Sequence, residues 1–174
     1  DMVVTLTDAK GNLVDRHKVR FGFRSVGTRG RAITLNGNDI FTRGNVENAN
    51  FAKDGTPWMS VAEWAKMFRT LKEEDGIDTI RFHSWCPPEA AFTAADEVGM
   101  MLQPEAGIWQ DGWMKSGDPV GFGHPVDGFV RREMRAIVDA YGNHPSFLSL
   151  AIGNELGSSN FEEMGKMMSE VREH

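Results

Sequence analysis

The sequence predicts an α/β fold built around a parallel sheet, and three patterns carry that prediction. From about residue 40 onward, strand-like and helix-like segments alternate, which favours parallel strands joined by helices. The loops that follow the expected strands are long, whereas the loops that precede them are short. Residues 147–152 form a nearly continuous apolar run that leads into Glu155. Together these patterns predict the first half of a parallel (β/α)8 barrel, with a small open sheet as the alternative.

Composition sets the frame for this prediction. The 174 residues, 40% of them hydrophobic and 25% charged, suffice for one sizeable core. The formal net charge of -6 comes without a basic cluster, so neither nucleic acid nor a membrane is expected as a partner. The sequence contains no apolar run of membrane-spanning length and no signal peptide, and any targeting segment is expected upstream of Asp1. Location is left open, with a periplasmic or secreted one favoured.

Residues 1–30 are expected to close a β-domain. Residues 2–7 alternate apolar and polar side chains, residues 8–12 have turn chemistry, and residues 13–19 resume an extended pattern. Because an isolated hairpin is marginally stable in water, these antiparallel strands are interpreted as the end of a domain whose other strands lie outside the sequence. Residues 21–30 are interpreted as a connector.

The second unit, residues 31–174, is expected to open with a tight hairpin. Residues 32–35 and 40–42 flank an Asn36-Gly37 turn, a dipeptide typical of two-residue hairpin loops. Ser60, followed three residues later by Glu63, then predicts a capping box at the start of a helix.

Strands and helices alternate through the rest of the chain. The predicted strands are residues 77–82, 100–102 and 147–152. The predicted helices are residues 61–71, 87–98, 126–141 and 161–171. Gly99 is expected to end the second helix. The third helix is expected to turn these side chains inward: Phe129, Val130, Met134, Ile137 and Val138.

Long loops are expected at one end of the sheet, over residues 44–57, 83–87 and 105–125. In (β/α)8 enzymes the ligand binds at the carboxyl ends of the strands, where such loops gather. Glu155 stands just past the buried run, so it is a candidate acid or nucleophile. The alternative is that Gly153-Asn154 forms only a turn and Glu155 is an exposed charge.

A set of short motifs keeps a common register along the chain. The motifs are Phe21-Gly22-Phe23-Arg24, Leu35-Asn36-Gly37, Arg43-Gly44, Ile80-Arg81, Asp96-Glu97-Val98-Gly99, Asn143-His144-Pro145-Ser146 and Gly153-Asn154-Glu155. In order and approximate spacing they resemble glycoside hydrolase family 2, which includes β-galactosidases and β-glucuronidases. The resemblance implies that residues 1–30 end an immunoglobulin-like β-sandwich and that residues 31–174 form the first four βα units of a catalytic (β/α)8 barrel.

The same resemblance assigns chemistry to Glu155 and Asn154. Glu155 matches the general acid/base of a retaining exo-glycosidase that removes terminal sugars from oligo- or polysaccharides, and Asn154 matches a neighbouring asparagine that contacts a sugar hydroxyl. Such an acid is needed because a sugar oxygen leaves poorly unless it is protonated as the bond breaks. The nucleophile would come from the seventh strand, outside this sequence, so the chain alone is expected to be inactive. The expected partners are a carbohydrate substrate and the remaining domains, and a homo-oligomer is compatible with the sequence.

Four further rim residues are candidate substrate contacts. Arg81 matches the family arginine at the end of the second strand, and both a pocket scaffold and a structural ion pair are compatible with it. His83 is a candidate sugar contact, although His83-Ser84-Trp85-Cys86-Pro87 departs from the family pattern Ser-His-Tyr-Pro. Glu105 matches the second acid of an Asp-Glu pair that ends the third strand, and Asn48 follows the first strand as a polar pocket candidate.

Neither a metal nor another cofactor is expected. The acid and histidine that follow Glu105 in metal-binding β-galactosidases are absent, because Gly107-Ile108-Trp109-Gln110 stands in their place. Tryptophans in the rim loops are candidates for stacking on sugar rings, with core packing as the alternative: Trp85, Trp109, Trp113 and Trp58. Trp64 is expected in the core, and Cys86 is expected to be an inert thiol.

Two other functional classes compete with the glycosidase. The first is a non-catalytic carbohydrate-binding barrel, in which Glu155 only contacts a ligand. The second is an unrelated nucleotide-binding α/β domain. That domain would need a glycine-rich phosphate loop after the first strand, and Arg43-Gly44-Asn45-Val46-Glu47 is not one.

Overall fold

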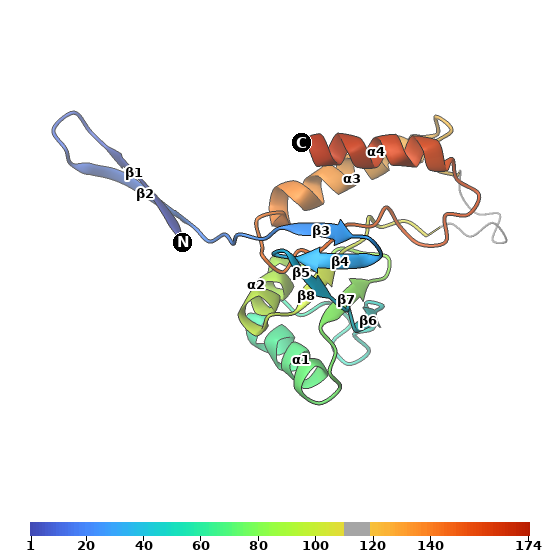
Figure 1. The fold of residues 1–174 in the computed structure, drawn as a ribbon. Helices are drawn as coiled ribbons and strands as arrows, with labels where there is room; N and C mark the ends of the chain where they lie inside the picture. The colour runs from blue at the N-terminus through green and yellow to red at the C-terminus, as the bar shows by residue number, and fades with distance from the viewer. Residues whose placement is uncertain (110–118) are drawn as a thin grey trace.

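The computed structural model describes residues 1–109 and 119–174, and it orders the described strands in three small sheets (Figure 1). β1 (Met2–Thr7) and β2 (Leu13–Val19) form an antiparallel hairpin that projects away from the rest of the chain. Apart from the end of β2, the residues of both strands are exposed. The two strands predicted at the N-terminus are therefore confirmed.

An antiparallel sheet of β3 (Val26–Arg29), β4 (Ala32–Leu35) and β5 (Asn38–Ile40) follows. The prediction that residues 21–30 are only a connector is wrong for their second half, because β3 pairs with β4 along its whole length. The Asn36-Gly37 turn is confirmed: both residues have positive φ, 52° and 79°, as its mirror-image geometry requires. The second hairpin strand begins directly after that turn, two residues earlier than predicted. The division of the chain at residue 30 stays a prediction.

The third sheet is parallel and consists of β6 (Gly44–Glu47), β7 (Thr79–Phe82) and β8 (Met101–Gln103) in that order. This confirms the α/β class with a parallel sheet. β6 corrects the prediction that residues 44–47 already belong to a rim loop. Val46 is the only apolar side chain in β6, so no alternating pattern marks it, and its pairing with β7 makes it a strand.

Residues 147–154, here called the 147–154 segment, run parallel beside β8 and its continuation without forming a regular strand. Three isolated bridges join the two: Leu102 with Phe147, Glu105 with Ala151, and Trp109 with Asn154. Between the first and second bridges there are three residues along the β8 side (102 to 105) and four along the 147–154 segment (147 to 151). Between the second and third bridges the numbers are reversed, four (105 to 109) and three (151 to 154). The pairing register therefore shifts by one residue and then shifts back, which prevents a continuous ladder.

This irregularity corrects the prediction of a strand buried on both faces over residues 147–152. Phe147 and Ile152 are buried, but residues 148–151 are only half-buried. Among the described residues, the 147–154 segment has a neighbouring strand on one edge only, which is β8 with its continuation.

Four helices confirm the four that the periodicity predicts. They are α1 (Val61–Glu73), α2 (Glu89–Val98), α3 (Pro125–Tyr141) and α4 (Phe161–Glu173). Ser60 is the N-cap residue of α1, but within the described residues its side chain makes no capping hydrogen bond, so the predicted capping box is wrong. Gly99 ends α2 with a φ of 74°, as expected. Phe129 contradicts its predicted burial, since it is 38% exposed on α3. None of the described helices is long and apolar enough to cross a membrane.

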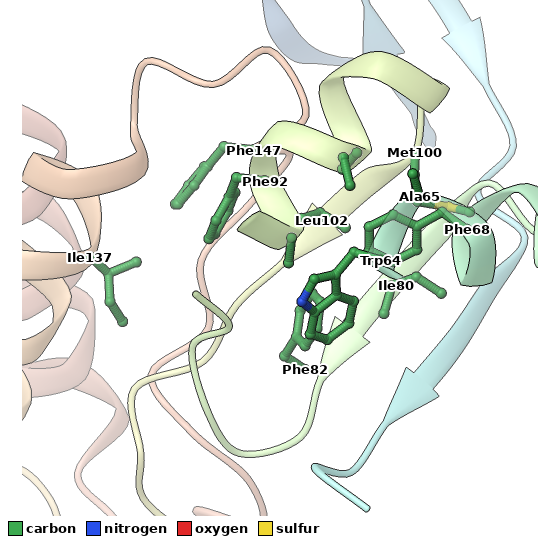
Figure 2. Packing of buried hydrophobic residues seen from close by; sticks show 13 residues of the cluster. Trp64, Ala65, Phe68, Ile80, Phe82, Phe92, Met100, Leu102, Ile137 and Phe147 are labelled. Carbon is green, nitrogen blue, oxygen red and sulfur yellow. The ribbon is translucent and has the colours of Figure 1, made fainter. Parts of the chain in front are cut away.

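The core lies between the parallel sheet and the helices α1 and α2. Figure 2 shows Trp64 and Phe68 of α1 beside Phe82 of β7 and Leu102 of β8, all fully buried. Phe92 of α2 stacks on Tyr141 and Phe147, which ties the 147–154 segment and α3 to the same core. Trp64 is therefore a core residue, as predicted.

Two other tryptophans and the cysteine join this core from its edge. Trp58 packs edge-to-face on Phe51 and Trp64, and its indole Nε1 donates to Asp54 Oδ2 at 2.9 Å. Trp58 was a candidate sugar platform with core packing as the alternative, and the structure shows the packing alternative. Burial, together with the Glu133 carboxylate, raises the pKa of the Cys86 thiol to about 12. That shift keeps the thiol protonated near neutral pH and agrees with an inert cysteine.

Polar groups fasten the chain at the amino end of the parallel strands, and the group formed by Arg24, Asp96, His144 and Ser146 is here called the latch. His144 Nδ1 lies 2.7 Å from Asp96 Oδ2, and the backbone N–H of Ser146 donates to Asp96 Oδ1 at 3.0 Å. Arg24 donates to the carbonyl oxygens of Gly142 and His144 at 3.1 and 3.0 Å. Burial raises the pKa of Asp96, but the hydrogen bonds from His144 and Ser146 outweigh it, and the net shift is downward.

Candidate functional site

Polar side chains meet where the parallel strands end, and this edge of the sheet is here called the rim. Arg81 of β7 lies at its centre. Its guanidinium donates from Nε to Glu105 Oε1 at 2.5 Å and from Nη2 to Asn154 Oδ1 at 2.7 Å. The Arg81 guanidinium thus links Glu105 and Asn154, and the three residues belong to three different predicted βα units. Arg81 forms an ion pair and also scaffolds the rim, so both interpretations of it apply.

Two members of this group have polar atoms that remain unpartnered. Glu105 is 1% exposed and Asn154 is 8% exposed, yet within the described residues Glu105 Oε2 and Asn154 Nδ2 have no hydrogen-bond partner. The hydroxyl of Ser84, which follows β7, is buried and unpartnered in the same sense. Each such atom costs on the order of 1–3 kcal/mol unless water or a ligand satisfies it. The rim therefore contains a buried acceptor, a buried donor and a buried hydroxyl that no described group satisfies.

Glu155 stands next to this group with its carboxylate exposed. Its φ is 53°, in the left-handed region that residues other than glycine seldom adopt. The indole Nε1 of Trp109 donates to Glu155 Oε2 at 2.5 Å. His83 in turn lies edge-to-face against Trp109, with ring centroids 4.8 Å apart and planes at 80°.

A hollow of about 420 Å³ opens beside these residues. It is lined by Asn48, His83, Ser84, Gly107, Ile108 and Trp109. The structure thus brings Asn48, His83 and Trp109 to one hollow, and Trp109 connects that hollow to Glu155.

Trp85 does not join this group. Its indole packs against Phe51, Trp64 and Phe82, and its Nε1 donates to the carbonyl oxygen of Glu47 at 3.3 Å. The packing alternative describes it better than a sugar platform does. Trp113, a further tryptophan candidate, lies outside the described residues.

The register of the rim depends on Gly153. A Cβ at this position would lie 2.4 Å from Ile108 Cγ1 and 2.5 Å from Ile108 O, which leaves space for glycine alone. This close approach lets the Asn154 N–H donate to Ile108 O at 3.0 Å and sets Asn154 opposite Trp109. Gly153 is therefore more than a turn residue. A glycine directly after the apolar run 147–152 was the available sequence signal for such an approach.

The sequence did not indicate two other features of the rim. One is the hydroxyl of Ser84, and the other is the hydrogen bond between Trp109 and Glu155. Among residues 1–109 and 119–174, no three His, Cys, Asp or Glu side chains gather closely enough to hold a metal ion.

Comparison with known proteins places the chain beside two kinds of glycosidase. No protein-family model matches the sequence. A β-galactosidase of Alteromonas mediterranea is 26% identical over 160 residues, which cover 90% of this chain and 15% of that enzyme. A β-galactosidase of Pseudoalteromonas haloplanktis is also 26% identical, over 159 residues and with 89% and 15% coverage. The chain thus spans only 15% of the length of these relatives.

Solved structures with a similar fold are β-glucuronidases. The enzyme from Ruminococcus gnavus, in complex with C6-substituted uronic isofagomine, superposes with a TM-score of 0.72 at 18% identity and covers 97% of this chain and 28% of that one. β-Glucuronidase 3 of Bacteroides uniformis gives a TM-score of 0.68 at 19% identity, with 97% and 21% coverage. These matches show a shared fold, and together with the sequence relatives they confirm the predicted resemblance to β-galactosidases and β-glucuronidases.

Proposed function

We propose that the chain is part of the catalytic region of a retaining exo-glycosidase, with Glu155 as its general acid/base. In this proposal residues 31–174 form the first four βα units of a (β/α)8 barrel, and residues 1–30 end an immunoglobulin-like β-sandwich. The nucleophile, four further barrel strands and the rest of the sandwich lie outside the chain. The relatives named β-galactosidase support this assignment, since they match along 90% of the chain.

The unpartnered polar atoms at the rim are the observation that carries the proposal. A sugar hydroxyl both donates and accepts a hydrogen bond, so it complements a site that offers a free acceptor at Glu105 Oε2 and a free donor at Asn154 Nδ2. Without a ligand or a bound water here, the protein would keep the desolvation cost of both atoms. Arg81 holds the two side chains together and so fixes the spacing of their free atoms.

Glu155 suits proton transfer because it is exposed beside these buried groups. In the first step its carboxyl group donates a proton to the glycosidic oxygen as that bond breaks, and in the second step its carboxylate takes a proton from the attacking water. A retaining enzyme holds its nucleophile about 5 Å from this group. The position of Glu155 past the 147–154 segment leaves its carboxylate accessible to such a partner.

The test is the substitution Glu155→Gln in the intact protein. kcat/KM on substrates with a sugar leaving group should fall by about 10²–10⁴-fold, because a sugar alkoxide departs only when protonated. kcat/KM on dinitrophenyl glycosides should fall far less, since kcat/KM reports the first step and that leaving group needs no proton. Azide should partly restore turnover, because it attacks the glycosyl-enzyme intermediate without a general base.

Glu162→Gln is the matched control, since the Glu162 side chain is 83% exposed on α4 and forms an ion pair with Lys166. This variant should keep its activity on both substrates. Equal losses on both substrates in Glu155→Gln, without azide rescue, would rule out the acid/base role. An intact protein that binds oligosaccharides but hydrolyses none would instead support the non-catalytic carbohydrate-binding barrel.

A further inference from the structure

We infer that Trp109 is a positioning residue that orients Glu155 and determines which of its two carboxyl oxygens carries the proton. This inference rests on the proposed acid/base role of Glu155. Its structural basis is the hydrogen bond from the Trp109 indole Nε1 to Glu155 Oε2 at 2.5 Å.

The backbone holds the two residues in place for this bond. The Asn154 N–H donates to the carbonyl oxygen of Ile108 at 3.0 Å, and Asn154 pairs with Trp109 in a parallel bridge. The side chain that follows Asn154 is thereby brought beside the indole. Since Gly153 permits this register through its close approach to Ile108, the pairing of Trp109 with Glu155 is built into the sheet edge.

The chemistry of the indole gives the bond a direction. An indole N–H donates a hydrogen bond and cannot accept one. Glu155 Oε2 therefore acts as the acceptor. Because a carbonyl oxygen accepts a hydrogen bond better than a protonated carboxyl oxygen does, this bond favours placing the proton of a protonated Glu155 on Oε1, which is left for the glycosidic oxygen. Trp109 thus selects a single reactive oxygen and restricts rotation of the carboxyl group.

His83 restrains the indole from the other side. The two rings lie edge-to-face at 4.8 Å, and both line the rim hollow. Trp109 is 51% exposed, so without this contact its side chain would have ample freedom to rotate. The sequence made this indole a candidate for stacking on sugar. Its hydrogen bond to Glu155 supports a positioning role instead, and kinetics can separate the two roles.

The test is Trp109→Phe in the intact protein, which keeps an aromatic ring beside His83 and removes the N–H donor. We expect kcat/KM on substrates with sugar leaving groups to fall about tenfold, the scale of one hydrogen bond to a charged group at a half-exposed position. kcat/KM on dinitrophenyl glycosides should change less than twofold, because that leaving group needs no proton in the first step. A sugar platform would behave differently, because its loss lowers kcat/KM for both substrates.

Trp58→Phe is the matched control, since it removes the same kind of bond, from indole Nε1 to Asp54 Oδ2, away from the rim. This variant should show wild-type kinetics. Trp109→Phe with unchanged kcat/KM on sugar leaving groups, or with an equal loss of kcat/KM on both substrates, would overturn the inference. Glu155→Gln in the same experiment separates the two proposals. If that variant shows leaving-group dependence and Trp109→Phe does not, only the positioning role fails; if neither shows it, the acid/base assignment itself fails.

Discussion

The two ends of the parallel sheet differ in how completely their polar groups are hydrogen-bonded. At the latch, Asp96 uses both carboxyl oxygens, one near His144 and one for the Ser146 N–H, and Arg24 is engaged by two carbonyl oxygens. At the rim, Glu105 and Asn154 are buried, but each leaves one polar atom without a partner among the described residues. Satisfied polar groups stabilise a fold, whereas unsatisfied ones cost stability and are available to a ligand. We therefore expect the latch to contribute stability, and under the proposed function the rim contributes recognition.

Asp96→Ala at the latch should have the largest effect on stability. The substitution leaves the Ser146 N–H and the His144 ring without their acceptor in a site where the Asp96 side chain is 9% exposed and the His144 side chain 16%. We expect the free energy of unfolding to fall by about 2–4 kcal/mol. Chemical denaturation measures this loss, while kcat per folded molecule should stay close to that of the wild type.

Asp139→Ala is the control for this variant. Asp139 also pairs with a histidine, His174, at 2.8 Å, but the two side chains are 63% and 43% exposed. An exposed pair of this kind contributes less than about 1 kcal/mol. Equal losses in both variants would show that the latch contributes no more than a surface ion pair.

Substituting two tightly packed glycines, one near the latch and one at the rim, should have effects of intermediate size on stability. A Cβ on Gly22 would lie 2.6 Å from Pro145 near the latch, and a Cβ on Gly153 would lie 2.4 Å from Ile108 at the rim. Gly22→Ala and Gly153→Ala should each destabilise the protein by about 1–3 kcal/mol, because the added methyl group overpacks its site. Only Gly153→Ala should also lower kcat on sugar leaving groups, since it displaces Glu155 relative to Trp109.

Gly157→Ala controls for the loss of glycine itself, because its Cβ would have no described atom within 4 Å. It should alter neither the unfolding free energy nor the kinetics. A Gly153→Ala variant that loses stability but keeps its full leaving-group profile would separate the register of the rim from its chemistry.

Substituting two serines should change the free energy of unfolding least. The informative result is whether each substitution lowers or raises it. Ser146 Oγ near the latch donates to the carbonyl oxygen of Phe92 at 3.4 Å, whereas the buried Ser84 Oγ at the rim has no partner among the described residues. Ser146→Ala should lower the free energy of unfolding by about 0.5–1 kcal/mol. Ser84→Ala should leave it unchanged or raise it by up to about 1 kcal/mol. A destabilising Ser84→Ala would mean that the rim hydroxyl is satisfied in solution.

The local sequence pattern was sufficient to predict the helices, the Asn36-Gly37 turn and the Gly99 helix end. The helices follow from apolar side chains at helical spacing, as in α1, where Trp64 and Phe68 are buried. The Asn36-Gly37 turn and the Gly99 helix end follow from positive φ angles that few residues adopt. β3 and β6 were missed because their residues have weak strand patterns, and only pairing with β4 and β7 makes them strands.

For the site, the sequence by itself determined which residue types reach the rim. Glu155, Asn154, Arg81 and Glu105 each follow or end a strand-like segment, and parallel strands bring such positions to one edge. The tertiary structure alone decided how they meet. Arg81 joins Glu105 to Asn154, Trp109 reaches Glu155, and Trp85 turns into the core. The partners in these contacts are separated by as few as 3 residues, for Phe82 and Trp85, and by as many as 73, for Arg81 and Asn154. They depend on strand register and on the space around Gly153, and neither quantity is encoded in the local spacing of residue types.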